Sequence, residues 1–275
     1  MKKILVPVDF SKPSEYAARI ATKIAKKIGA VIYLIHLIEI PSGVVDMGAS
    51  SKFSIPESML YLRKTKEKIV AFKEKNFPKD LKIEYFIKIN TPFEGIRKCA
   101  HKIDADLIVM GSKGHSEFEE IMIGSNTEKV VRTSTVPVII IKKDDKNFKL
   151  KNLVFASNFK KDDKAVFNKF IGFANQFKSK IHLLKINTPS NFESSREATK
   201  KIKRFVKRYE LPKYSINIYN DTSVEKGILN FSKDNNSDLI ALCSHGRSGL
   251  SHLFSPSVSK KLSKFAAIPI LTIKG

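Results

Sequence analysis

The chain has 275 residues, of which 42% are hydrophobic and 28% charged, a composition typical of a globular protein with an ample core and about two domains. No stretch reaches 18 apolar residues, so no transmembrane helix is expected, and the first apolar run is too short for a signal peptide. Two cysteines offer no disulfide framework, which favours a reducing compartment and hence the cytoplasm.

The net charge of +23 allows two interpretations. A dense basic run between Lys200 and Arg208 could bind nucleic acid or another polyanion. Alternatively, it is the solvated face of a helix in a lysine-rich protein. Because no nucleic-acid-binding motif accompanies the run, we prefer the second interpretation and expect no nucleic-acid partner.

The first half of the chain alternates between apolar, β-rich segments and segments with helical spacing. Helices are expected to begin at Ser11, Glu57, Thr91 and Gly124, and Gly29 is expected to end the first of them. This order predicts a doubly wound α/β domain, whose ligand lies beyond the carboxyl ends of the strands. The expected strands are 3–9, 31–38, 82–89, 107–110 and 136–141.

The connection from Pro41 to Pro56 is long and polar, and it follows the second predicted strand on the ligand side. It is either a lid over the ligand or a disordered connector, and we prefer the connector. His36, within that second strand, is interpreted as a core residue with satisfied hydrogen bonds.

The glycines after the fourth strand have the arrangement of a phosphate cradle. Gly111 and Gly114 follow the strand, and Gly124-Ser125 begin the next helix. Glycines let the backbone approach a ligand closely, and the first turn of a helix favours an anion through its N–H groups and its dipole.

The second half repeats the pattern of the first. Residues 152–159 resemble residues 4–11, and residues 267–273 resemble residues 135–141. We therefore predict two domains, residues 1–143 and 150–275, joined by a charged segment.

Two of these segments resemble the universal stress protein family. Gly111-x2-Gly114-x9-Gly124-Ser125 matches the nucleotide-binding motif of the family, and Val6–Ser11 (VPVDFS) matches its first strand. The resemblance implies two tandem five-stranded parallel sheets with strand order 3-2-1-4-5. It also implies a stress-response sensor or regulator that binds ATP, or AMP or ADP, with or without Mg²⁺.

The resemblance assigns roles to ten residues of the first half. Asp9 is expected to bind the nucleoside, and Pro7 and Leu37 to wall the adenine. Met110 could equally be a core residue, and His115 a solvent-facing loop residue. The expected ligand-binding residues are Pro7, Asp9, Leu37, Met110, Gly111, Gly114, His115, Gly124, Ser125 and Asn126.

The second half has lost part of the motif. Cysteine adds a Cβ where the backbone must approach phosphate, and proline removes a backbone donor. We therefore expect the working site in the first half; weak binding in the second half through Gly246, Ser257 and the helix dipole remains an alternative. The changed positions are Asn158, Cys243 and Pro256, in place of Asp9, Gly111 and Gly124.

The sequence and the family resemblance leave three functions open. The preferred one is a nucleotide-binding regulator that presents a changed surface to an unknown protein partner. A slow ATPase or autophosphorylating enzyme is less favoured, because the sequence lacks a P-loop, a nucleophile elbow, metal-ligand spacing and an obvious general base. The third is a chaperone-like interaction protein with a vestigial site.

The last strands of the two halves bear on assembly. Members of the family commonly dimerise through this strand. In a tandem chain the edges at 136–141 and 269–273 can pair with each other, which gives an internal pseudo-dimer and covers both edges. A monomer could then suffice, although further homo-oligomerisation stays open.

Overall fold

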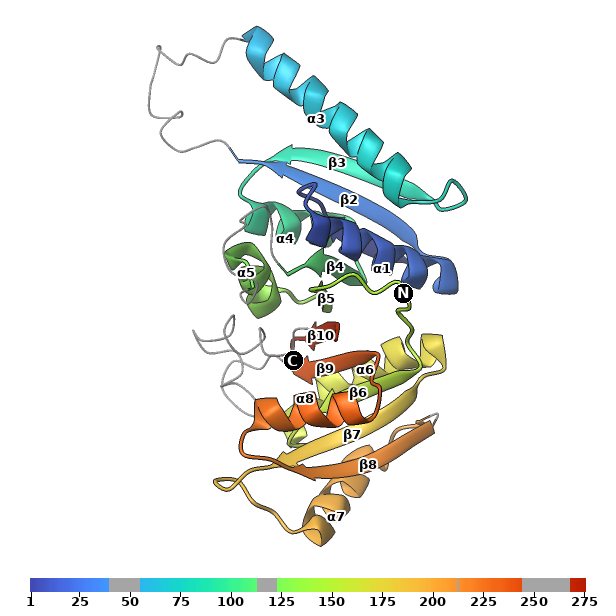
Figure 1. Ribbon diagram of the computed structural model, residues 1–275, viewed down its shortest axis with the longest axis vertical. Helices are drawn as coiled ribbons and strands as arrows, with labels where there is room; N and C mark the ends of the chain where they lie inside the picture. The colour runs from blue at the N-terminus through green and yellow to red at the C-terminus, as the bar shows by residue number, and fades with distance from the viewer. Residues whose placement is uncertain (40–54, 113–122, 212, 244–267) are drawn as a thin grey trace.

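The computed structural model describes residues 1–39, 55–112, 123–211, 213–243 and 268–275. Figure 1 shows two α/β halves arranged along the long axis of the molecule, with the last strands of both halves at the centre. The first half contains β1 (Lys3–Pro7), α1 (Lys12–Ile28), β2 (Val31–Ile38), α3 (Ile55–Asn76), β3 (Ile83–Ile89), α4 (Pro92–Lys102), β4 (Leu107–Gly111), α5 (Ser125–Thr133) and β5 (Val138–Ile141).

The described residues of the second half follow the same order, and the positions equivalent to α5 lie outside them. The first helix of the second half is preceded by a short 3₁₀ turn, η1, which has no counterpart in the first half. The elements are β6 (Asn152–Ala156), η1 (Lys161–Asp163), α6 (Lys164–Phe177), β7 (Lys180–Asn187), α7 (Ser195–Val206), β8 (Lys213–Asn220), α8 (Val224–Asp234), β9 (Leu239–Cys243) and β10 (Ile270–Ile273).

The ten strands of the described residues form one sheet in the order β3-β2-β1-β4-β5-β10-β9-β6-β7-β8. The order 3-2-1-4-5 implied for the first half is confirmed, and its strands are parallel. β5 and β10 pair in antiparallel fashion, with Ile139 opposite Leu271. The predicted pairing of the two last strands within one chain is therefore confirmed.

Both faces of the sheet are covered by helices, which explains the nearly continuous apolar strands. Ile4 and Val6 of β1 pack in the core cluster that contains α1. Leu5, between them, packs with α4 and α5 in the other cluster.

The repeat extends to details of the backbone. Asp106 accepts hydrogen bonds from the backbone N–H groups of Lys2 and Lys3, and Asp238 accepts the equivalent pair from Lys151 and Asn152. Four residues at equivalent positions of the two halves share the left-handed conformation: Phe10 (φ 65°), Phe159 (φ 53°), Asp104 (φ 48°) and Asn236 (φ 47°).

Several boundaries differ from the sequence prediction. β5 begins at Val138 rather than Val136, since Pro137 has no N–H for the ladder and offers only its carbonyl, to Ile108 N at 2.9 Å. β1 ends at Pro7, two residues before the predicted end, and the helix predicted from Glu57 begins at Ile55. The end of α1 at Gly29, in the αL conformation with φ 68°, is as predicted.

Candidate functional site

A cavity of about 320 Å³ opens at the carboxyl ends of β1, β2 and β4. This is the edge where ligands of doubly wound sheets bind. Eight of the ten predicted residues line it, and Gly114 and His115 lie outside the described residues. The lining residues are Pro7, Val8, Asp9, Ser14, Ile35, His36, Leu37, Pro92, Ile96, Met110, Gly111, Gly124, Ser125, Asn126 and Thr127.

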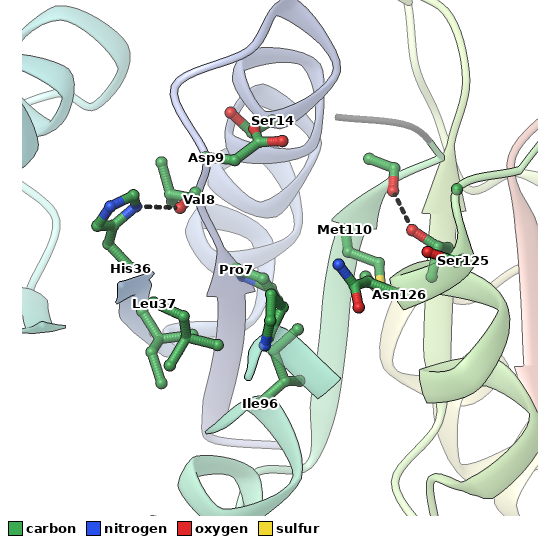
Figure 2. A pocket seen from close by; sticks show the side chains of 15 residues that line it. Pro7, Val8, Asp9, Ser14, His36, Leu37, Ile96, Met110, Ser125 and Asn126 are labelled. Atoms are coloured by element: carbon green, nitrogen blue, oxygen red, sulfur yellow. Dashed lines mark hydrogen bonds between the residues drawn. The ribbon is translucent and has the colours of Figure 1, made fainter. Parts of the chain in front are cut away.

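Asp9 lies in the turn between β1 and α1, on one side of the cavity (Figure 2). Its Oδ1 accepts hydrogen bonds from the N–H of Ser11 at 3.0 Å and from the Ser11 hydroxyl at 2.5 Å. Ser11 also caps α1, because its side chain accepts from Ser14 N. The start of α1 therefore holds the Asp9 carboxylate beside the cavity, at the carboxyl end of β1.

Gly111 is required by packing inside the protein. A Cβ on this residue would lie 2.7 Å from Cβ of Pro13 and 2.8 Å from the Pro13 carbonyl. The sequence prediction attributed this glycine to a close approach of phosphate. The structure shows that a glycine is needed here even without a ligand, because α1 lies close to the end of β4.

The start of α5 forms the other side of the cavity (Figure 2). Its N-cap, Gly124, makes no side-chain cap hydrogen bond. The N–H groups of the first turn and the positive end of the helix dipole therefore favour an anion here. Gly124 N itself donates to Ser112 O at 2.7 Å, so the expected donor from Gly124 is already used inside the protein.

The end of the cavity next to α4 is apolar. Leu37 lies against α4 because Gly95 has no Cβ there; an added Cβ would be 2.2 Å from Leu37 Cδ2. Together with Pro7 and Ile96, Leu37 forms a wall suited to a flat apolar group (Figure 2).

Sequence reasoning missed several lining residues, of which His36 is the clearest. Its hydrogen bonding is satisfied, as predicted, since Nδ1 lies 2.8 Å from Val8 O, but the residue lines the cavity. Burial lowers the pKa of His36, against the opposing effects of the Val8 hydrogen bond and the Asp9 charge. Pro92 and Ile96 could have been found from the helix start that follows the third strand.

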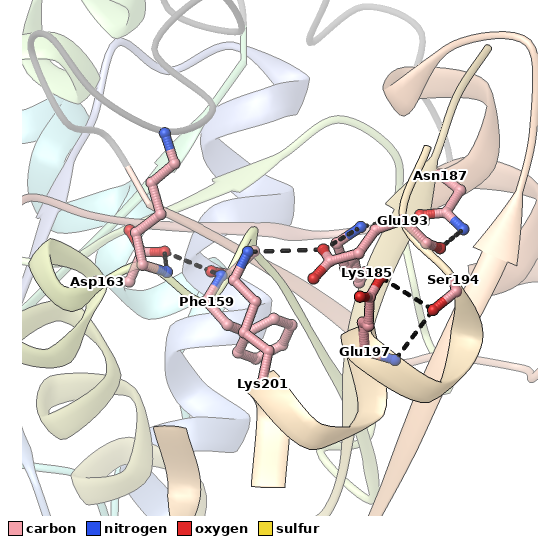
Figure 3. Close-up of polar contacts among 10 residues, drawn as sticks. Phe159, Asp163, Lys185, Asn187, Glu193, Ser194, Glu197 and Lys201 are labelled. Atoms are coloured by element: carbon pink, nitrogen blue, oxygen red, sulfur yellow. Dashed lines mark hydrogen bonds and ion pairs between the residues drawn. The ribbon is translucent and has the colours of Figure 1, made fainter. Parts of the chain in front are cut away.

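The equivalent turn of the second half is held differently. Asp163, only 3% exposed, accepts from the Ser157 hydroxyl at 2.6 Å and from Lys160 N at 3.0 Å (Figure 3). Counting from the first residues of β1 and β6, Asp163 occupies the position of Ser14, which lines the cavity of the first half. A buried carboxylate at this position disfavours a second anion.

In the second half, a lysine that belongs to a cluster of charged side chains takes the position of His36. Lys185, at the equivalent position of β7, is 2% exposed and binds Asn187 Oδ1 at 2.8 Å and Glu193 Oε2 at 3.0 Å (Figure 3). Lys201 of α7 lies 3.6 Å from the same Glu193 oxygen. The motif positions Gly246, Pro256 and Ser257 lie outside the described residues.

Two further properties concern only the described part of the chain. Within it, no helix is long and apolar enough to cross a membrane. No group of three or more His, Cys, Asp or Glu side chains in these ranges could hold a metal ion.

The fold and the cleft define a tandem pair of doubly wound α/β domains whose ligand edge is built from β1, β4 and α5. The model of the universal stress protein family matches residues 1–142 and again residues 149–274. The chain therefore belongs to the universal stress protein family and carries two copies of its domain.

Individual relatives agree with this assignment. Two universal stress proteins of Methanocaldococcus jannaschii, MJ0531 and MJ0577, are 34% and 30% identical over 151 and 155 residues. These matches cover 53% and 52% of this chain, and 84% and 95% of the relatives. The crystal structure of a universal stress protein from Archaeoglobus fulgidus shares the fold over 99% of this chain and 98% of its own, at 21% identity and a TM-score of 0.72.

Proposed function

We propose that the cleft of the first half binds an adenine nucleotide, either ATP or its products ADP and AMP, and that the protein acts as a stress sensor or regulator. The observation that carries this proposal is the convergence of eight of the ten expected ligand-binding residues on one cavity at the ligand edge of the sheet. We place this activity in the cytoplasm, where binding would present a changed surface to a protein partner.

The two ends of the cavity suit the two ends of a nucleotide. The apolar wall of Pro7, Leu37 and Ile96 fits a purine base, and the carboxylate of Asp9 can accept from sugar hydroxyls or from the base. At the far side, the uncapped start of α5 at Ser125 and Asn126 fits phosphate oxygens.

One solved universal stress protein is a complex with cAMP; it is 21% identical to this chain over 52% of it, with a TM-score of 0.36. That ligand is a property of that protein. The present proposal rests on the cleft and on the motif that lines it.

The test is titration calorimetry of the full chain with ATP, ADP, AMP and GTP, with and without Mg²⁺. We expect saturation at one adenine nucleotide per chain. Asp9→Ala should weaken ATP binding about tenfold or more, because it removes a charged hydrogen-bond acceptor.

Asn158→Ala is the matched control, since Asn158 occupies the equivalent position of the second half. It should leave ATP affinity and stoichiometry unchanged. The proposal fails if the wild-type protein shows no binding at millimolar ATP, or if Asp9→Ala binds as tightly as the wild type.

A further inference from the structure

The end of β1 is held by two hydrogen bonds to β2. Val8 N donates to Ile35 O at 2.8 Å, and Val8 O accepts from the His36 ring, whose Nδ1 lies 2.8 Å away. The regular register of the two strands ends one residue earlier, at Pro7 opposite Ile35. The imidazole therefore takes the place of a ladder N–H beyond the end of the strand.

The chemistry of this contact fixes the tautomer. A carbonyl oxygen only accepts, so the proton must be on Nδ1. Because burial lowers the pKa of His36, the ring is neutral at pH 7, and Nε2 is then without a proton. The bond to Val8 is nevertheless retained in both protonation states, since Nδ1 carries a proton in each.

His36 also contacts the residue on the other side of Asp9. The Phe10 ring centroid lies 4.5 Å from that of His36, and Phe10 has φ 65°, a region that bulky side chains rarely adopt. Phe72 of α3 also packs against Phe10, with ring centroids 6.0 Å apart. The imidazole thus contacts the residues on both sides of Asp9, and it supports the backbone of the turn in which Ser11 binds the carboxylate.

The second half gives the contrast. Phe159 has the same left-handed backbone, with φ 53°, but Lys185 stands in the place of His36 and binds Asn187 and Glu193. The turn after β6 is held by the hydrogen bond between Ser157 and Asp163. This turn carries Asn158 where the first half has Asp9. His36 and Asp9 thus occur together in the first half, and both are replaced in the second half.

We infer that His36 is a positioning residue: through Val8 O and the Phe10 ring, it orients the Asp9 carboxylate toward the cavity and so sets nucleotide affinity. The inference rests on the proposed nucleotide site. It adds a residue that acts through Asp9.

The test is a double-mutant cycle measured by ATP titration of the full chain. His36→Leu should weaken ATP binding about tenfold in the wild-type background. In the Asp9→Ala background the same substitution should change affinity less than about twofold, because its effect passes through the missing carboxylate. His36→Asn, which keeps a donor near the position of Nδ1, should restore affinity to within about threefold of wild type.

The outcomes separate this inference from the proposed function. Absence of ATP binding to the wild type would overturn the nucleotide site itself. If the wild type binds and His36→Leu binds equally well, or is weakened equally with and without Asp9, only the role of His36 is wrong.

A readout without nucleotide completes the test. The ¹⁵N chemical shifts of the His36 side chain at pH 7 should show a protonated Nδ1 and an unprotonated Nε2. The opposite tautomer would contradict the bond to Val8 O.

Discussion

His182 is a buried base whose burial makes stability depend on pH. It is 4% exposed in β7, its Nδ1 lies 3.1 Å from the Ser215 hydroxyl, and Phe231 packs edge-on against the ring at 5.9 Å. Its Nε2 has no hydrogen-bond partner among the described residues. Burial, followed by the nearby charge of Lys180, lowers the pKa of His182.

The lowered pKa predicts the direction of the pH effect. The unfolded chain takes up a proton near pH 6.5, whereas the folded chain resists it, so the contribution of His182 is complete above pH 6.5 and is lost as the pH falls below that value. Urea unfolding between pH 7.5 and 5.5 should show a falling free energy of unfolding. The fall should be smaller in His182→Leu; an equal fall in both proteins would contradict the assignment.

At Gly111 the end of β4 lies so close to α1 that an added Cβ would overlap the side chain and backbone of Pro13. Gly111→Ala should lower the free energy of unfolding by about 1–3 kcal/mol, since the new Cβ overlaps Pro13. It should also weaken ATP binding, because displacement of Pro13 moves Ser14, which lines the cavity. Urea unfolding and ATP titration measure the two effects.

Gly172→Ala is the control for this substitution. A Cβ on Gly172 meets no atom within 4 Å, and the residue lies inside α6. The change should therefore leave ATP binding unaltered and stabilise the protein by up to about 1 kcal/mol. Equal effects of the two alanines would show that the contact with Pro13 does not matter.

The elements also show what a sequence can predict. Apolar periodicity and turn residues are local signals, and they located the strands of the first half and the repeat in the second. The strand order came from the family resemblance. The boundaries at Val138 and Ile55 were each missed by two residues. At Val138 the reason is Pro137, which has no N–H for the ladder.

The candidate site divides in the same way. Glycines and the acid of the motif are visible in the sequence, and eight of the ten named residues line one cavity. His36 and Ser14 were not among the ten expected ligand-binding residues, since their role depends on which neighbouring strand or turn their side chains meet. The ion pair between Lys185 and Glu193 was not predicted either, because it joins β7 to the loop before α7.

At the scale of the molecule, the antiparallel pairing of β5 with β10 turns two domains into one ten-stranded sheet. Thr272, 2% exposed, lies opposite Val138 in this ladder, and its hydroxyl donates to Val138 O at 3.3 Å. The pairing satisfies two strand edges that would otherwise be open to another chain. We therefore expect the protein to be a monomer that unfolds in one cooperative transition.

Thr272→Pro tests this expectation, because proline inside a central strand removes ladder hydrogen bonds. Opening the junction should expose β5 and β10, so light scattering after size-exclusion chromatography should detect self-association, and urea unfolding should split into two steps. Lys213→Pro, at the exposed first residue of the edge strand β8, is the control and should change neither property. A Thr272→Pro protein that stays monomeric, with one unaltered transition, would show that the two halves do not depend on each other through this pair of strands.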